Sequence, residues 1–255
     1  MKHVKKKFVK AEKVSKEVTA ILEGHGSIAS IMPLEISKSL DQYSANIQTE
    51  DNEIIQGFTY KDSDKLFVIP EPNPIIIYFE TARHSSMRIP AEREKVFTEI
   101  DQVYQTRDNF YTFYSTASIT AIFLFNTIEA FMNSLIPDSY KYERHLEQKT
   151  EILDRFQIQR FVPFEEKIKK VIPKIMGKAF HLEFAHKHES IAKLKEFRDA
   201  IMHSKSDDGF PPRYFKNLYT TSLDFNYNET LQHVRDFLNF YETDLIEECP
   251  CGKDF

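Results

Sequence analysis

Glycine is scarce in this chain, with 6 residues among 255. Because glycine supplies the positive backbone φ angles of many tight turns, its scarcity argues against a turn-rich β-sandwich. Neither the G-x-x-x-x-G-K-[ST] pattern nor the G-x-G-x-x-G pattern occurs, which excludes the usual glycine-rich phosphate-binding loops. Tryptophan is absent, but 22 Phe and 12 Tyr provide enough aromatic surface for a packed core.

Cysteine is limited to Cys249 and Cys251, so a disulfide framework is excluded and a reducing compartment is favoured. The Cys249–Gly252 sequence resembles half of a zinc knuckle, but a closed zinc site needs four ligands, and no further Cys or His follows. Three histidines also lack the i, i+4 spacing of a helical metal pair: His181, His186 and His188. We therefore expect no metal and no cofactor.

Long hydrophobic runs are also missing. The longest run, Ala121–Phe125, is far too short to cross a bilayer, and Asn126 and Glu129 interrupt its continuation. The lysine-rich start lacks a following apolar segment, so we expect no signal peptide, a cytoplasmic location and no membrane partner. The net charge of -5 excludes a generally basic surface, so contact with nucleic acid requires a local basic patch.

The expected elements divide the chain into a small α+β segment over residues 1–88, a mainly α, up-and-down helical bundle over 89–247, and a tail over 248–255. The lysines of segment 2–22 fit either a solvated helix face or a surface that contacts RNA phosphates. Apolar periodicity predicts helices at 2–22, 34–43, 91–136 (with a break), 165–175, 190–202 and 230–246, and strands at 54–60, 66–69 and 75–79.

The most informative feature is a polar group on two of these helices. Glu129 has apolar neighbours on its own helix, and a carboxylate in such surroundings needs a partner, because burying it alone costs several kcal/mol. Arg198 is suitable, since its planar fork can bind Glu129 and still offer donors to a phosphate. Asn126 and Asn133 extend this polar seam. The alternative is a seam that only fixes the register of the two helices.

On the helix of Arg198, Asp199 and His203 are i, i+4 neighbours, so the carboxylate can orient the imidazole. His203 lies in the expected last turn, where a histidine poised near neutrality can act as general acid or base. Residues five apart on a regular helix are separated by about 140° and roughly 7.5 Å of rise, so Arg198 and His203 cannot converge within it. Either the helix end unwinds or a second subunit completes the site, and we expect a homodimer.

The sequence Leu194–His203, Leu-x-x-x-Arg-Asp-Ala-Ile-Met-His, resembles the signature of HEPN domains (higher eukaryotes and prokaryotes nucleotide-binding). That signature has an arginine, a polar residue and a histidine at the end of a helix. The helix around 119–135, with Glu129, resembles the first helix of the family, which often has an acidic residue facing the motif. The resemblance covers residues 95–246 and implies a helical bundle that dimerises, so that two motifs meet in a cleft. Many members are metal-independent endoribonucleases, often toxins or antiphage effectors.

The resemblance also implies roles for the site residues. Arg198 would hold the scissile phosphate, and His203 would transfer a proton while the ribose 2′-hydroxyl attacks and a cyclic phosphate forms. Asp199 and Glu129 would position this pair, and Asn126 and Asn133 would contact the substrate. In one toxin subgroup a Tyr that the antitoxin modifies follows two residues after the His. Lys205 takes that position here, which argues against this mode of neutralisation and suits a contact with RNA.

Three functions therefore stay open. The first is a HEPN endoribonuclease that cleaves RNA and is controlled by an antitoxin or another regulatory protein. The second is a non-catalytic HEPN module that binds nucleotide or RNA, or docks a partner. The third is a structural dimer domain in which the pair of Arg198 and Glu129 only specifies packing.

Overall fold

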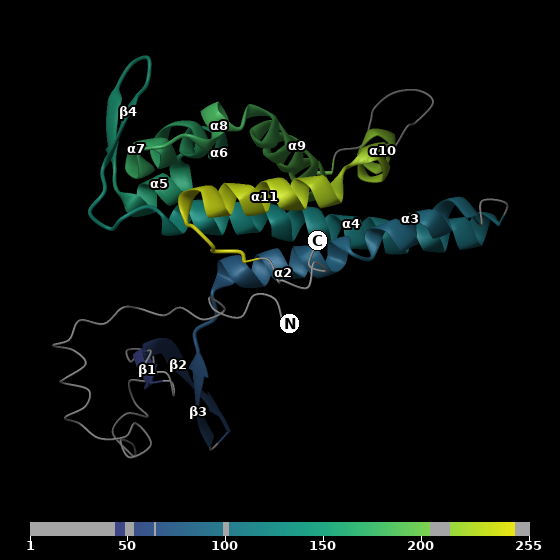
Figure 1. Ribbon diagram of the computed structural model, residues 1–255, viewed down its shortest axis with the longest axis horizontal. Helices are drawn as coiled ribbons and strands as arrows, with labels where there is room; N and C mark the ends of the chain where they lie inside the picture. The colour runs from purple at the N-terminus through teal and green to yellow at the C-terminus, as the bar shows by residue number, and fades with distance from the viewer. Residues whose placement is uncertain (1–43, 49–53, 64, 99–101, 205–214, 248–255) are drawn as a thin grey trace. The chain divides into compact units, whose positions relative to one another are not determined.

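The computed structural model describes residues 44–48, 54–63, 65–98, 102–204 and 215–247 (Figure 1). The chain divides into two compact units, Met1–Asn73 and Pro74–Phe255. The described part is mainly helical, as the sequence predicts. The helices expected at 2–22 and 34–43, as well as Lys205 and the cysteine tail, lie outside the described residues.

The first unit contains an antiparallel sheet of three strands in the order β1-β2-β3. The strands are β1 (Ser44–Gln48), β2 (Ile54–Asp62) and β3 (Lys65–Pro70). Ser44 pairs with Phe58 between β1 and β2, and Thr59 pairs with Val68 between β2 and β3. The strands predicted at 54–60 and 66–69 are thus confirmed.

The strand predicted at 75–79 is wrong, because these residues belong to helix α2 (Pro74–Ser86). The β-branched run Ile75–Ile77 favours a strand locally, but Pro74 at the first helical position favours a helix start. Ile75, Ile76 and Phe79 are buried in the helix, which packs on α4 (Val103–Ser134). The helical unit therefore begins at Pro74, earlier than the boundary expected after residue 88.

Helix α4 is the centre of the second unit, and α2, α3, α9, α10 and α11 all pack on it (Figure 1). The last turn of α4 is followed by a two-stranded antiparallel hairpin and several short helices. The remaining elements are α3 (Ile89–Thr98), β4 (Tyr142–His145), β5 (Thr150–Leu153), α5 (Arg155–Phe161), α6 (Phe164–Glu166), the π-helix η4 (Lys167–Val171), α7 (Ile172–Met176), α8 (Phe180–Glu183), α9 (Ala185–Met202), α10 (Lys216–Asp224) and α11 (Tyr227–Tyr241).

The expected long helix over 91–136 is present as α3 and α4, and the helices expected at 165–175, 190–202 and 230–246 correspond to α6–α7, α9 and α11. The hairpin β4–β5 and helix α10 were not expected. The hairpin is attached to α6 through Glu166, which accepts hydrogen bonds from Tyr142 Oη (2.9 Å) and Arg144 Nε (3.0 Å). Burial and the Glu166 contact raise the pKa of Tyr142 to about 12, so its hydroxyl stays a donor.

Aromatic rings fill the core where α4, α8 and α11 meet. Phe131 of α4, Phe180 of α8 and Phe237 of α11 are fully or almost fully buried. Phe237 makes edge contacts with Phe131 at 6.0 Å and with Phe180 at 5.2 Å between ring centroids. Edge-to-face packing of this kind adds to the hydrophobic gain and fixes the relative position of the helices.

Among the described residues, α4 is the one helix long and apolar enough to cross a membrane by length and composition. More than half of its most apolar window is buried inside the protein. The central helix of a helical core has the same properties, and α4 occupies that place, with buried residues from Phe113 to Met132.

Phe237→Ala tests the aromatic core. Removing a fully buried ring leaves a cavity between Phe131 and Phe180, so we expect the free energy of unfolding to fall by about 3–5 kcal/mol. Urea titration followed by circular dichroism measures this change. The control is Phe156→Ala, because Phe156 is 63% exposed and the loss of its ring is expected to cost less than about 0.5 kcal/mol. Equal effects of the two variants would contradict this description of the core.

The lowered pKa of His233 predicts how the free energy of unfolding depends on pH. Burial lowers the pKa of His233 below its ordinary value of 6.5; Glu229 opposes the shift, whereas His186 and Lys187 add to it. A folded chain that disfavours the imidazolium binds fewer protons than the unfolded chain, so stability is lost as pH falls below about 6.5. Urea titrations between about pH 7 and about pH 5 should show a smaller loss in His233→Gln than in the wild type. An unchanged pH dependence in this variant would contradict the prediction.

Candidate functional site

Helix α9 provides Arg198 and Asp199 and ends at Met202, so His203 is its C-terminal cap. Ile191, Leu194 and Phe197 repeat at helical spacing and are buried, and α9 packs on α4 and α11. This buried stripe determines how α9 is rotated about its axis. Arg198, next to Phe197, is therefore placed at the edge of the interface with α4, where its side chain is 20% exposed.

Three groups surround the guanidinium of Arg198. Its central carbon lies 3.7 Å from the centre of the Phe125 ring of α4, a cation–π contact. Its Nη1 atom donates a hydrogen bond to Asp199 Oδ1 at 2.8 Å. Its Nη2 atom lies 3.8 Å from Glu129 Oε2. The structure thus brings Arg198, Asp199 and Glu129 together, as the sequence predicts.

The ion pair between Arg198 and Glu129 is loose, because 3.8 Å is longer than a hydrogen bond. In addition, the buried Nε atom of Arg198 has no hydrogen-bond partner among the described residues. Nε and Nη2 form one edge of the planar guanidinium, the edge that can bind two oxygens of a carboxylate or phosphate. This edge is therefore not saturated.

Lys167 is a member of the site that sequence reasoning missed. Its side chain is 4% exposed, and its Nζ lies 3.7 Å from Glu129 Oε1 and 3.3 Å from the carbonyl oxygen of Gln159. Burial lowers the pKa of Lys167, and the charge of Glu129 partly offsets this effect. The sequence contains a signal for it, since Phe164, Lys167 and Val171 follow the spacing of a buried helical stripe.

Lys167 is also the first residue of the π-helix η4. Single turns of π-helix occur often at functional sites, because the wider turn changes the direction of side chains relative to an α-helix. Here both Lys167 and the following Ile168 are buried. Helical periodicity alone does not predict such a turn.

His203 is not brought to this cluster within one chain. It is exposed, its backbone N–H donates to the carbonyl oxygen of Asp199 at 2.9 Å, and its φ of -122° and ψ of 44° end the helix. Among the described residues, no side-chain bond joins its ring to Asp199. The carboxylate of Asp199 is instead bound to Lys195 Nζ at 2.7 Å and to Arg198. The sequence expectation that Asp199 orients the imidazole is therefore not met in a single chain.

Asn126 and Asn133 lie half-buried on the same face of α4 as Glu129. The backbone carbonyl of Asn133 accepts a hydrogen bond from Gln159 Nε2 at 3.1 Å, which ties the end of α4 to α5. Its side-chain Oδ1 is buried and lacks a partner among the described residues. Lys205, the third residue expected to contact substrate, lies outside the described residues.

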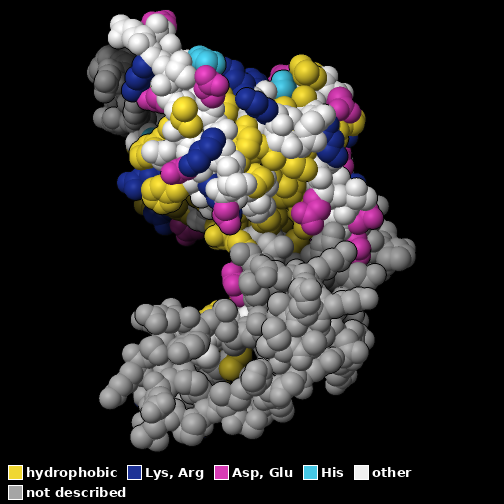
Figure 2. All heavy atoms as spheres, turned by 90° about the vertical axis from the view of Figure 1, so that its left-hand side faces the viewer, with side chains coloured by type: hydrophobic (Ala, Val, Ile, Leu, Met, Phe, Trp, Pro, Cys, Tyr) yellow, Lys and Arg dark blue, Asp and Glu magenta, His cyan; other side chains and the backbone are white. Residues whose placement is uncertain are grey.

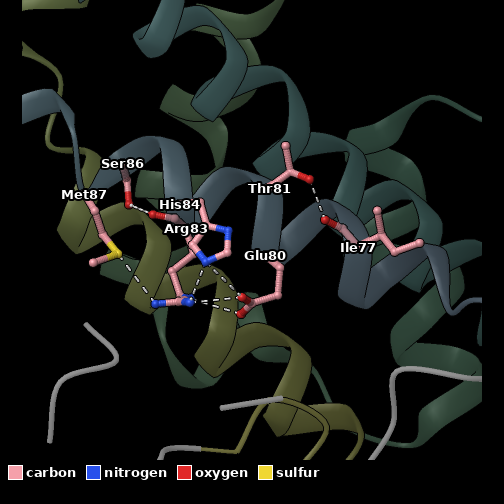
Figure 3. Close-up of polar contacts among 7 residues, drawn as sticks. All are labelled: Ile77, Glu80, Thr81, Arg83, His84, Ser86 and Met87. Atoms are coloured by element: carbon pink, nitrogen blue, oxygen red, sulfur yellow. Dashed lines mark hydrogen bonds and ion pairs between the residues drawn. The ribbon is translucent and has the colours of Figure 1, made fainter. Parts of the chain in front are cut away.

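A second polar cluster lies on α2 (Figure 3). Arg83 donates to both oxygens of Glu80, from Nε and from Nη2, at 3.0 Å each, and both residues are 5% exposed. His84 Nε2 lies 3.1 Å from Arg83 Nη2. Figure 3 shows the carboxylate and the guanidinium facing each other across one turn of the helix. Because the carboxylate already accepts two hydrogen bonds, we interpret this cluster as structural. The sequence did not predict it, because helix α2, on which Glu80 and Arg83 are one turn apart, was not expected.

The face of the molecule in Figure 2 shows no large basic patch among the described residues. There, at the end of the helical unit where β4 and α5 lie, side chains of both charge signs are mixed with apolar ones. Within the part of the chain that the structure describes, no three His, Cys, Asp or Glu side chains are grouped so as to hold a metal ion.

Arg198→Ala tests whether the cluster is needed for folding. After this change Asp199 keeps Lys195 and Glu129 keeps Lys167, so no acid is left without a cation. We expect the free energy of unfolding to fall by only about 1–2 kcal/mol, from the lost packing on Phe125 and the lost hydrogen bond. Urea titration measures it. A loss above about 4 kcal/mol would show instead that the pair is a structural element.

Comparison of the chain with models of known protein families, with curated proteins and with solved structures found no match.

Proposed function

We propose that this protein is a metal-independent endoribonuclease of the HEPN type that cleaves RNA as a homodimer. The observation that supports the proposal is the position of Arg198. It belongs to the Arg-Asp-x-x-x-His sequence at the end of α9, and its unsaturated edge faces Glu129 of the central helix α4. An arginine that is held on an aromatic ring and whose Nη2 atom makes no short hydrogen bond is suited to bind a phosphate group.

The proposed reaction uses the substrate's own 2′-hydroxyl as nucleophile. The neutral imidazole of His203 accepts the proton of this hydroxyl, and the 2′-oxygen attacks the adjacent phosphorus. The bond from phosphorus to the 5′-oxygen breaks, and this oxygen leaves with a proton from the solvent or an imidazolium. The products are a 2′,3′-cyclic phosphate and a 5′-hydroxyl, and Arg198 stabilises the negative charge that develops on the phosphate oxygens.

A second copy of the chain is part of the proposal. On a regular helix, residues five apart point about 140° apart. His203 caps α9 and keeps the helical backbone bond to Asp199, so its Cα continues the helical path past Arg198. Among the described residues, no contact joins the side chains of Arg198 and His203 within a single chain. In a dimer, Arg198 of one protomer and His203 of its partner can face the same phosphate.

The exposed position of His203 fits this arrangement, since its ring has no bond to other described residues that would have to be broken. The same proposal places the protein in the cytoplasm, where RNA is available. We also propose that the protein acts as a toxin or antiphage effector, and that an antitoxin or another regulatory protein restrains it.

A second candidate function is favoured by one observation. The carboxylate of Asp199 is bound to Lys195 and Arg198 and so does not activate His203. A HEPN module that binds nucleotide or RNA without cleaving it needs the cationic cluster alone. This module would bind RNA with equal affinity whether or not His203 is present.

The test is incubation of the purified protein with total cellular RNA in the presence of EDTA. We expect the wild type to produce fragments with cyclic phosphate ends, and we expect Arg198→Ala and His203→Ala to lower the rate at least about 100-fold. Gel electrophoresis and end-group analysis measure the products.

Two matched controls separate the site from general charge effects. Arg160→Ala removes a cation over Phe161 of α5, and His145→Ala removes an exposed ring from β4, and neither should change the rate. RNA binding without cleavage by the wild type would favour the second candidate. Absence of both binding and cleavage would contradict both functions.

A further inference from the structure

The two oxygens of Glu129 face two different cations. Oε1 lies 3.7 Å from Lys167 Nζ, and Oε2 lies 3.8 Å from Arg198 Nη2. We propose that Lys167 is a positioning residue, which retains the Glu129 carboxylate when this carboxylate turns away from Arg198 and a phosphate of the RNA takes its place. This inference rests on the proposed function and assigns it a further residue.

Glu129 competes with RNA for the same edge of Arg198. A carboxylate and a phosphate both bind the two donors of a guanidinium edge, so a close ion pair with Glu129 would block the phosphate. The observed distance of 3.8 Å shows that the pair is not close. Because Lys167 attracts the other oxygen, Glu129 is drawn toward two cations and is bound tightly by neither.

The position of Lys167 is well defined, whereas that of Glu129 is adjustable. Lys167 is almost completely buried, and its Nζ also lies 3.3 Å from the carbonyl oxygen of Gln159. Glu129 is 36% exposed and lies at the surface end of the cluster. A small rotation of the glutamate toward Lys167 would lengthen its distance to Arg198 without leaving its charge unpaired.

Arg198 also remains in place when Glu129 moves. Its Nη1 atom is bound to Asp199 at 2.8 Å, and its guanidinium lies on Phe125. Asp199 is in turn bound to Lys195 at 2.7 Å. The edge formed by Nε and Nη2 is thus the part of Arg198 that becomes available, and Lys167 sets how easily this happens.

The test compares Lys167→Met, Glu129→Gln and the double variant with the wild type. The methionine keeps the apolar stem but removes the charge. Of the two cations Lys167 and Arg198, Glu129 then has Arg198 alone and should pair with it more closely. We expect KM for a labelled single-stranded RNA of mixed sequence to rise about tenfold, with kcat changed less than about twofold. In the double variant, the neutral amide no longer competes for Arg198, so KM should return to within about threefold of the wild type.

A merely structural lysine would not be rescued by removing the charge of Glu129. Lys187→Met is the control, because Lys187 of α9 is half-buried and is bound to Asp236 at 2.7 Å, so its partner is an acid other than Glu129. It should leave KM unchanged. Thermal unfolding of every variant checks that the chains are folded.

The outcomes separate this inference from the proposed function. If the wild type cleaves RNA and Lys167→Met has an unchanged KM, or the double variant is not rescued, the inference is wrong and the function stands. If the wild type binds the RNA without cleaving it, Kd replaces KM: it should rise in Lys167→Met and return toward the wild-type value in the double variant, and any other result overturns the inference. If it neither binds nor cleaves the RNA, both are overturned.

Discussion

The packing of α9 on α4 is the constraint on which the rest of the site depends. Three buried residues of α9, Ile191, Leu194 and Phe197, fix the rotation of this helix. With that stripe inside, Arg198 can only lie at the edge of the interface, over the ring of Phe125. The position of the guanidinium thus follows from hydrophobic packing, because its ion pair with Glu129 is too long to determine it.

Charges of opposite sign alternate along this edge, so none of them is buried without a partner. In order of contact they are Lys195, Asp199, Arg198, Glu129 and Lys167. The contacts of Asp199 are short and those of Glu129 are long. Asp199 therefore holds the arginine, while Glu129 is the more loosely bound member, which in our proposal gives way to a phosphate. Partly buried charge pairs of this kind are weak evidence for a large contribution to stability.

The meeting of Arg198 and Glu129 could be predicted from the sequence, because helical periodicity places both at the border of an apolar stripe, where opposite charges favour a pair. The sequence did not reveal that the Glu129 side chain is 36% exposed and its distance to Arg198 is long. The expected interaction of the Asp199 carboxylate with the His203 imidazole is not present within one chain. Lys195 lies one turn before Asp199 on the same helix, and its ammonium reaches the carboxylate in place of the His203 ring. This competing i, i+4 pair was visible in the sequence.

Two other features could not be derived from local patterns. The run Ile75–Ile77 favours a strand by itself and Pro74 favours a helix start, and burial against α4 decides for the helix. The π-turn at Lys167 is the other feature, since the spacing of apolar residues does not reveal it.

The central claim is that Arg198 and His203 act on one phosphate from two copies of the chain. Mixing the inactive variants Arg198→Ala and His203→Ala tests it most directly, since a mixed dimer contains one site with both residues intact. After exchange of subunits we predict about one quarter of the wild-type RNA cleavage, because half of the dimers are mixed and each has one of two sites. A mixture as inactive as its separate components would contradict the claim.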